Sequence, residues 1–161
     1  MAGRLWGAGG ETLRPLVLVV PALGSSQSAP EVEALCRALA GRGLAAVTLD
    51  LPLHGERASA KLSARLLACA SRPERSGADA RLWAAFLEQT ACDLAAAADA
   101  AGTRQGVAPR ALACVAFEPG AEPAARWAAR DPRVESLVRL PREAPAGEIV
   151  RLVCEGLGGA A

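Results

Sequence analysis

The chain has 161 residues, of which 52% are hydrophobic and 22% charged, and its formal net charge is +1. This composition is typical of one globular domain and excludes a disordered chain. A charge so close to zero gives no electrostatic basis for binding nucleic acid or an anionic membrane surface. The apolar run at residues 16–23 is too short to span a bilayer, and no signal-peptide cleavage site follows it. We therefore expect a cytoplasmic protein.

The first half of the chain predicts two buried strands with a helix between them. Residues 1–14 have little apolar pattern and are expected to form a ragged edge strand or no fixed structure. Residues 15–20 are rich in valine and leucine, as in a central parallel strand that is covered on both faces. Apolar residues then recur at helical spacing up to Gly41, and residues 43–50 predict the next strand.

The second half predicts three helices and three further strands. A polar segment with proline and glycine at residues 72–77 separates the first two helices. Helices are predicted at residues 58–70, 79–102 and 121–130, and strands at 111–117, 134–140 and 148–154. Strands that alternate with helices predict a single α/β domain over residues 1–161. We expect a three-layer αβα sandwich with a mostly parallel sheet of about five strands.

Four segments resemble motifs of the α/β-hydrolases, in the dienelactone-hydrolase-like branch. The turn after the third strand resembles the nucleophile elbow G-x-S-x-G-G, and the loop after the second resembles D-x-P-x-H-G. The segments are residues 116–121, 128–134, 106–110 and 49–57. The resemblance covers residues 15–140 and implies the strand order 2-1-3-4-5. It also implies that the N-terminal antiparallel strands and the C-terminal strand and helix of the family are missing.

The same resemblance places residues that do not fit the family's chemistry at its catalytic positions. Glu118 stands where the nucleophilic serine belongs, and the next residue, Pro119, has no N–H for the first oxyanion donor. The second donor would come from Leu23 or Gly24. The only histidine, His54, lies in the motif where the family uses it to brace the loop, and no histidine follows Leu140.

Three functions remain open from the sequence. The first is an inactive relative of the carboxylic ester hydrolases, and the second is a non-enzymatic binding or assembly module. The third is a weakly active hydrolase that uses Glu118. The expected pocket residues are Leu23, Ser25, His54 and Glu118, around a small ester-like or hydrophobic ligand. A truncated sheet would also expose an edge through which two copies could form a homodimer.

No cofactor or metal is expected. The five cysteines are widely spaced, and one histidine is too few for a usual zinc site. Most of the cysteines are interpreted as small buried apolar residues in a reducing compartment.

Overall fold

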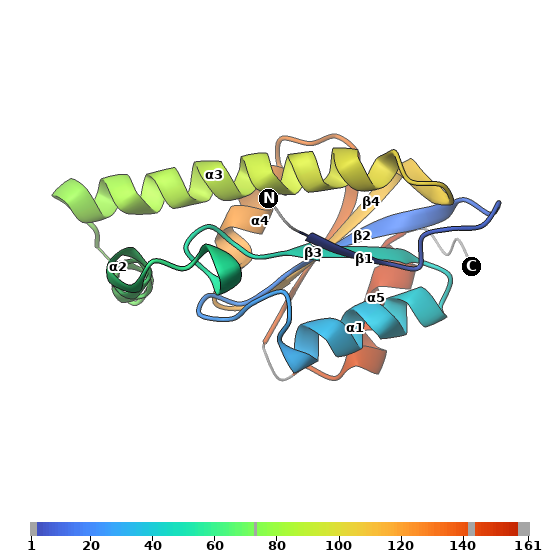
Figure 1. Ribbon diagram of the computed structural model, residues 1–161, viewed down its shortest axis with the longest axis horizontal. Helices are drawn as coiled ribbons and strands as arrows, with labels where there is room; N and C mark the ends of the chain where they lie inside the picture. The colour runs from blue at the N-terminus through green and yellow to red at the C-terminus, as the bar shows by residue number, and fades with distance from the viewer. Residues whose placement is uncertain (1–2, 73, 142–143, 158–161) are drawn as a thin grey trace.

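The computed structural model describes residues 3–72, 74–141 and 144–157, which form one sheet between layers of helices (Figure 1). The strands are β1 (Gly3–Trp6), β2 (Arg14–Val20), β3 (Ala45–Leu49), β4 (Val107–Phe117) and β5 (Val134–Leu140). The helices are α1 (Pro30–Gly41), α2 (Ala60–Ala70), α3 (Gly77–Gly102), α4 (Ala121–Ala128) and α5 (Ala146–Gly156), with a short 3-10 helix, η1, at Gly55–Arg57.

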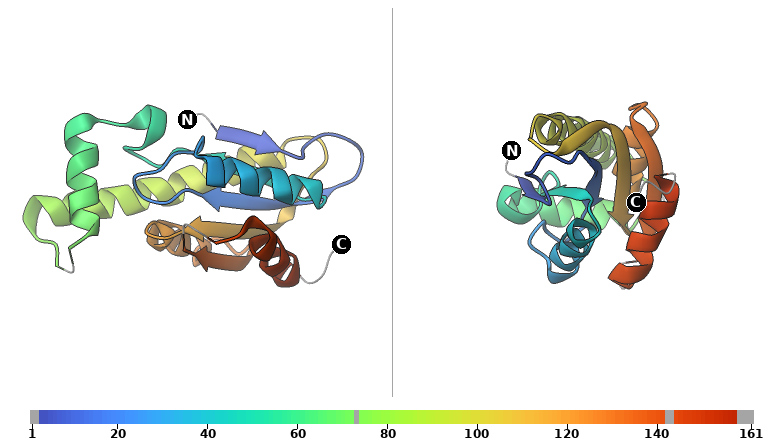
Figure 2. Two further views of the ribbon diagram at one scale, coloured as in Figure 1. Left: turned by 90° about the horizontal axis from the view of Figure 1, so that it is seen from below. Right: turned by 90° about the vertical axis from the view of Figure 1, so that its right-hand side faces the viewer.

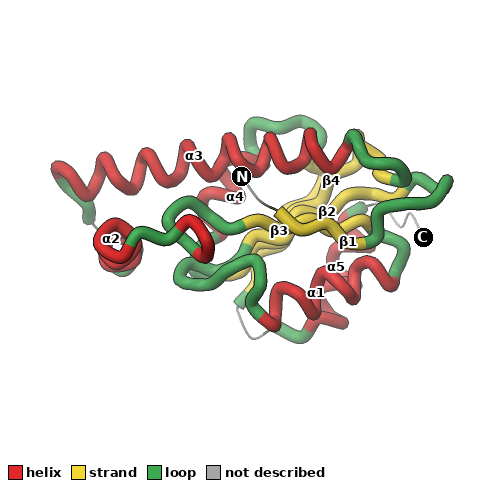
Figure 3. Tube along the Cα trace, in the orientation of Figure 1, coloured by secondary structure: helices red, strands yellow, loops and turns green. Residues whose placement is uncertain are grey.

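The sheet has the strand order β1-β3-β2-β4-β5. β1 runs antiparallel to β3, whereas all the other neighbouring strands are parallel. Helices α1 and α5 cover one face of the sheet, and α3 and α4 cover the other (Figure 2). Figure 3 shows the strands stacked in the middle of these layers. The three-layer αβα fold class that the sequence predicts is therefore confirmed.

Strand β2 shows why an unbroken apolar run becomes a central strand. Its residues alternate between the two cores, with Leu16, Leu18 and Val20 facing α3 and α4. Val17 and Val19 face α1 and α5 instead. All five side chains are fully buried, so neither face could be polar without leaving an unpaired group inside the protein.

The last predicted strand, residues 148–154, is wrong, because this segment lies within the helix α5. Ile149, Val150 and Val153 are its buried residues, at a spacing that places them on one side of a helix. An alternating strand pattern would instead have put Ile149 and Val150 on opposite faces. The amphipathic pattern packs this segment over the face of the sheet beside α1.

The fifth strand comes from the other end of the chain. β1 pairs antiparallel with β3, from Gly3 opposite Leu49 to Trp6 opposite Ala46. Leu5 packs against the core on the α3 side, and Trp6 packs against the core on the α1 side. The prediction of no N-terminal antiparallel strand is therefore corrected. The predicted order of the other four strands holds as β3-β2-β4-β5.

Helices α2 and α3 extend past the carboxyl ends of the parallel strands. In Figure 1 the N-terminal half of α3 projects beyond the sheet, and α2 lies beside it. Parallel α/β sheets place their ligands at this edge. None of the helices described is long and apolar enough to cross a membrane.

Candidate functional site

The candidate site is the turn that joins β4 to α4. The strand ends at the buried Phe117, and the exposed Glu118 and Pro119 follow it. The peptide bond between these two residues is cis. The Glu118 N–H donates to the Leu140 carbonyl at 2.8 Å, which ties the turn to the end of β5. The strand, turn and helix predicted from the sequence are confirmed here.

The backbone around this turn leaves few donors for an oxyanion. Pro119 has no N–H, and its carbonyl accepts a hydrogen bond from the Leu23 N–H at 2.5 Å. The two loops approach closely at Gly120, whose φ is +149°. A Cβ atom there would lie 3.1 Å from the Leu23 nitrogen. Of the three oxyanion-loop positions, only Gly24 keeps an N–H with no hydrogen-bond partner among the described residues.

The Glu118 carboxylate is about half exposed and faces a cation. The Arg139 Nε lies 3.6 Å from Glu118 Oε1, and both side chains are near 50% exposed, at 51% and 48%. An ion pair this long and this exposed contributes little to stability. Glu118 is therefore a solvated, ion-paired carboxylate at the start of α4.

His54 is held by its own loop and does not line the cavity beside the turn. It is buried, and its Nδ1 lies 2.8 Å from the Pro52 carbonyl oxygen. Because a carbonyl only accepts, we assign the ring proton to Nδ1. Nε2 is then an acceptor with no hydrogen-bond partner among the described residues. The ring packs against Phe86, with the ring centroids 6.0 Å apart.

One cavity, of about 300 Å³, opens beside the turn. We call it the elbow cavity. Of the four expected pocket residues, it brings together Leu23 and Glu118, whereas Ser25 and His54 do not line it. Ser25 is buried, and its Oγ donates to Glu31 Oε1 at 3.5 Å. The remaining lining residues are Ala70, Arg75, Trp83, Pro119, Gly120, Glu122, Pro123 and Arg139.

Several of these residues are not among the site residues that the sequence predicts, and Arg75, Trp83 and Arg139 are examples. Arg75 lies in the polar segment at residues 72–77, and Trp83 lies in the predicted helix at residues 79–102, where its side chain also packs in the core. Arg139 was interpreted only as part of a strand. The structure brings them together from the α2–α3 connection, α3 and β5. No local motif marks them, so only their distance in the fold reveals the cluster.

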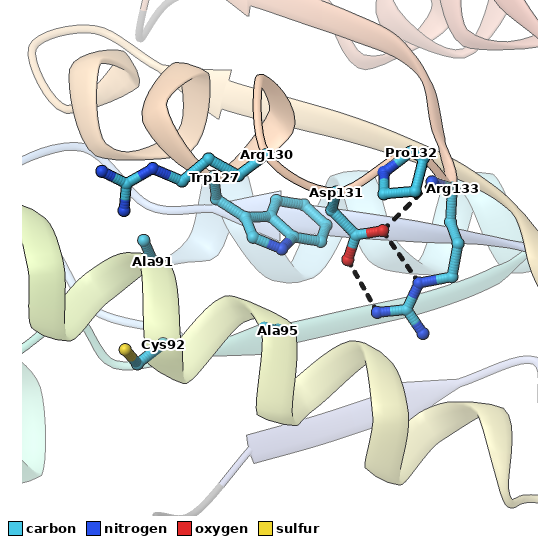
Figure 4. Close-up of a pocket in the computed structure, with 8 residues that line it drawn as sticks. All are labelled: Ala91, Cys92, Ala95, Trp127, Arg130, Asp131, Pro132 and Arg133. Atoms are coloured by element: carbon cyan, nitrogen blue, oxygen red, sulfur yellow. Dashed lines mark hydrogen bonds and ion pairs between the residues drawn. The ribbon is translucent and has the colours of Figure 1, made fainter.

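A second cavity, of about 490 Å³, lies between α3 and α4 (Figure 4). Its charged groups are already paired, since Arg130 binds Glu88 and Arg133 binds Asp131. Its residues are Ala91, Cys92, Ala95, Trp127, Arg130, Asp131, Pro132 and Arg133. Across residues 3–72, 74–141 and 144–157, no group of three His, Cys, Asp or Glu side chains could hold a metal ion.

The Asp131–Arg133 pair predicts a pH dependence of stability. Arg133 Nε and Nη2 donate to the two carboxylate oxygens at 2.9 and 2.7 Å, and these bonds hold the pKa of Asp131 below its usual value. The stabilisation is full above the unfolded pKa of about 3.9 and is lost as the pH falls through the lower folded pKa.

Asp131→Asn should therefore lower the free energy of unfolding at pH 7 by about 1 kcal/mol. Urea unfolding at pH 7 and at pH 3 measures this, and the difference between the two proteins should be smaller at the lower pH. A difference that stays constant with pH would contradict the prediction.

Comparison with known proteins finds likeness in solved structures alone. No protein-family model matches the chain, and no curated protein matches it. A cold-adapted esterase from an Arctic intertidal metagenomic library has 22% identity and a TM-score of 0.60, over 85% of this chain and 58% of that one. A proposed acetyl xylan esterase from Bacteroides fragilis has 15% identity and a TM-score of 0.56, over 78% and 36%. A proposed α/β hydrolase from Agrobacterium tumefaciens has 15% identity and a TM-score of 0.52, over 85% and 53%.

These likenesses establish the fold. The chain has the α/β-hydrolase fold, in agreement with the resemblance found in its sequence motifs. It spans between about one third and three fifths of the length of these three structures, at 36% to 58%. Identities this low do not carry an activity from one chain to another.

Proposed function

We propose that this chain is an α/β-hydrolase-fold protein that does not hydrolyse carboxylic esters. The observation that carries the proposal is the hydrogen bond from the Leu23 N–H to the Pro119 carbonyl at 2.5 Å. Ester hydrolysis on this fold needs two N–H groups aimed at the developing oxyanion. Here Pro119 supplies no N–H, and its carbonyl already accepts the hydrogen bond that the Leu23 N–H donates.

The remaining parts of the catalytic apparatus support the same proposal. A nucleophile on this turn needs a histidine that takes up its proton. The chain's only histidine, His54, donates to Pro52 and does not line the elbow cavity. Glu118 in turn has Arg139 as its counterion. Losing a single oxyanion donor typically lowers the rate by about 10²–10³-fold, and here several parts are missing.

The proposal extends to the branch of the fold. The elbow segment, residues 116–121, and the helix end, residues 128–134, resemble dienelactone-hydrolase-like esterases. Two of the structural relatives are described as esterases or proposed esterases. We infer descent from such an ester hydrolase, with Glu118 and Pro119 replacing its nucleophile and its oxyanion donor.

Hydrolysis of p-nitrophenyl acetate tests this proposal. The parent protein and Glu118→Ala, purified identically, should both release p-nitrophenol at the rate of the buffer. The reason is that neither has a general base or a paired oxyanion hole. Activity in the parent that Glu118→Ala abolishes would contradict the proposal and make Glu118 a working group. Circular dichroism of both proteins controls for folding.

A second candidate function is the binding of a small molecule without turnover. The elbow cavity favours it, because about 300 Å³ of space remains at the carboxyl edge of the sheet. Its walls combine apolar side chains with four charged ones, and polar groups placed among apolar walls fix the orientation of a ligand in small-molecule pockets. This binding role is compatible with the absence of ester hydrolysis.

A further inference from the structure

Arg75 presents a fixed positive charge at the elbow cavity. Its Nε donates to the Cys69 carbonyl at 2.7 Å, and its Nη2 donates to the Ala70 carbonyl at 3.4 Å. Its guanidinium lies over the ring of Trp83, 4.2 Å from the centroid. These contacts fix the guanidinium before any ligand binds. Little side-chain conformational entropy is therefore lost on binding.

All these partners of Arg75 are neutral. Two carbonyls and an indole ring orient the guanidinium, yet none of them cancels its charge. Among the described residues, Arg75 has no carboxylate partner, and its Nη1 makes no hydrogen bond. Free guanidinium donors are the groups that recognise a carboxylate or phosphate oxygen.

A second arginine lines the same cavity. Arg139 lines the same cavity from β5, and its only ion pair among the described residues is the 3.6 Å contact with Glu118. A contact of this length between half-exposed groups is readily exchanged. Arg139 can therefore turn toward an anion that is held by Arg75.

From this juxtaposition we propose that the elbow cavity binds a small organic monocarboxylate. The carboxylate of the ligand binds to the guanidinium of Arg75, and Arg139 contributes a second positive charge. This inference rests on the binding role proposed above. Leu23, Trp83 and Pro123 supply the apolar wall for the body of the ligand. A cavity of about 300 Å³ limits that body to about one ring with a short chain.

Two carboxylates restrict the charge of the ligand. Glu118 and Glu122 also line the cavity, and they would repel each additional negative charge brought near them. A phosphate monoester carries close to two charges at pH 7, whereas a carboxylate carries one. The charge balance therefore favours a monoanion.

Isothermal titration calorimetry with two probes of the same shape tests the inference. The probes are 3-phenylpropionate and its neutral amide, 3-phenylpropionamide. The acid should bind the parent protein about tenfold more tightly than the amide, since a hydrogen-bonded charge pair typically supplies that difference. Arg75→Gln should lower the affinity for the acid about tenfold and leave that for the amide unchanged.

Further variants separate charge from structure. Arg139→Gln should weaken binding of the acid, whereas Glu122→Gln should strengthen it by removing a like charge. Arg151→Gln is the matched control, because Arg151 is an exposed arginine on α5 that pairs with Glu155 and does not line the cavity. It should change neither affinity. If Arg75→Gln also weakens binding of the amide, the loss is structural, and the inference then depends on whether Arg139→Gln weakens binding of the acid alone.

Equal affinities of the parent for acid and amide, or no binding of either, would overturn the inference. Unchanged binding of the acid in both arginine variants would overturn it as well. These failures would leave the proposed lack of ester hydrolysis standing. That proposal fails separately, if p-nitrophenyl acetate is hydrolysed above the buffer rate and Glu118→Ala abolishes the activity.

Discussion

Replacing Asp50 with alanine is expected to lower the free energy of unfolding by about 3 kcal/mol, because two backbone donors, one buried and one partly buried, would lose their acceptor. Asp50 is 2% exposed. Its Oδ1 accepts from the Gln27 N–H at 2.8 Å, and its Oδ2 accepts from the Glu56 N–H at 2.9 Å. The carboxylate thus joins the loop before α1 to the 3-10 helix η1.

The chain around Asp50 is shaped to fit this carboxylate. A Cβ atom on Gly55 would lie 2.2 Å from the Asp50 Oδ2, so only glycine leaves room for it. The Asp50 carbonyl also accepts from Arg57 Nη1 at 3.0 Å, and the same nitrogen binds Asp93 Oδ2 at 2.5 Å. The link therefore continues from β3 to α3. The sequence motif had pointed to His54 as the brace, but the carboxylate holds more of the loop.

Urea unfolding, followed by circular dichroism, measures the effect of Asp50→Ala. Asp50→Asn should fall between the alanine variant and the parent, since one of its two side-chain positions becomes a donor that faces an N–H. Glu155→Gln is the matched control, because its carboxylate is exposed and, among the described residues, pairs with Arg151 along α5. It should change stability very little. A loss below about 1 kcal/mol for Asp50→Ala would mean that water replaces the carboxylate at both donors.

The fold was predictable where burial produces a clear pattern of apolar residues in the sequence. Residues of β2 and β4 form unbroken apolar runs, because helices cover both faces of the sheet. The segment of α5 was mispredicted as a strand, since its valines and isoleucine favour strands and it is short. The burial of both Ile149 and Val150 on one side distinguishes a helix from a strand here. Which residues are buried depends on tertiary packing, which the local sequence does not contain.

The candidate site was predictable only in its backbone. The turn at Glu118 and Pro119 follows from a local motif, whereas the position of Leu23 beside it follows from the resemblance to the α/β-hydrolases. The side chains that give the cavity its positive charges, Arg75 and Arg139, are separated by more than sixty residues of chain. Neither lies in a motif, so no periodicity or spacing connects them. Their meeting depends on where α2, α3 and β5 end.

Gly120→Ala is expected to lower the free energy of unfolding by about 2–3 kcal/mol, because the backbone there is open only to glycine. Its φ of +149° with a ψ of −5° is a conformation that side chains rarely adopt. A Cβ atom would also lie 3.1 Å from the Phe117 carbonyl oxygen and 3.2 Å from the Pro21 carbonyl oxygen. These neighbours are backbone atoms, so no rotamer change relieves the contact.

The same substitution at Gly147 should have the opposite sign. Gly147 lies in the first turn of α5 with nothing within 4 Å of an added Cβ, so Gly147→Ala should stabilise the protein by up to about 1 kcal/mol. Thermal and urea unfolding of both variants compare them directly. A small or favourable effect at Gly120 would mean that the loop holding Leu23 can move away from the turn. The Leu23 N–H would then be free for an oxyanion, and the physical basis for the proposed lack of ester hydrolysis would weaken with it.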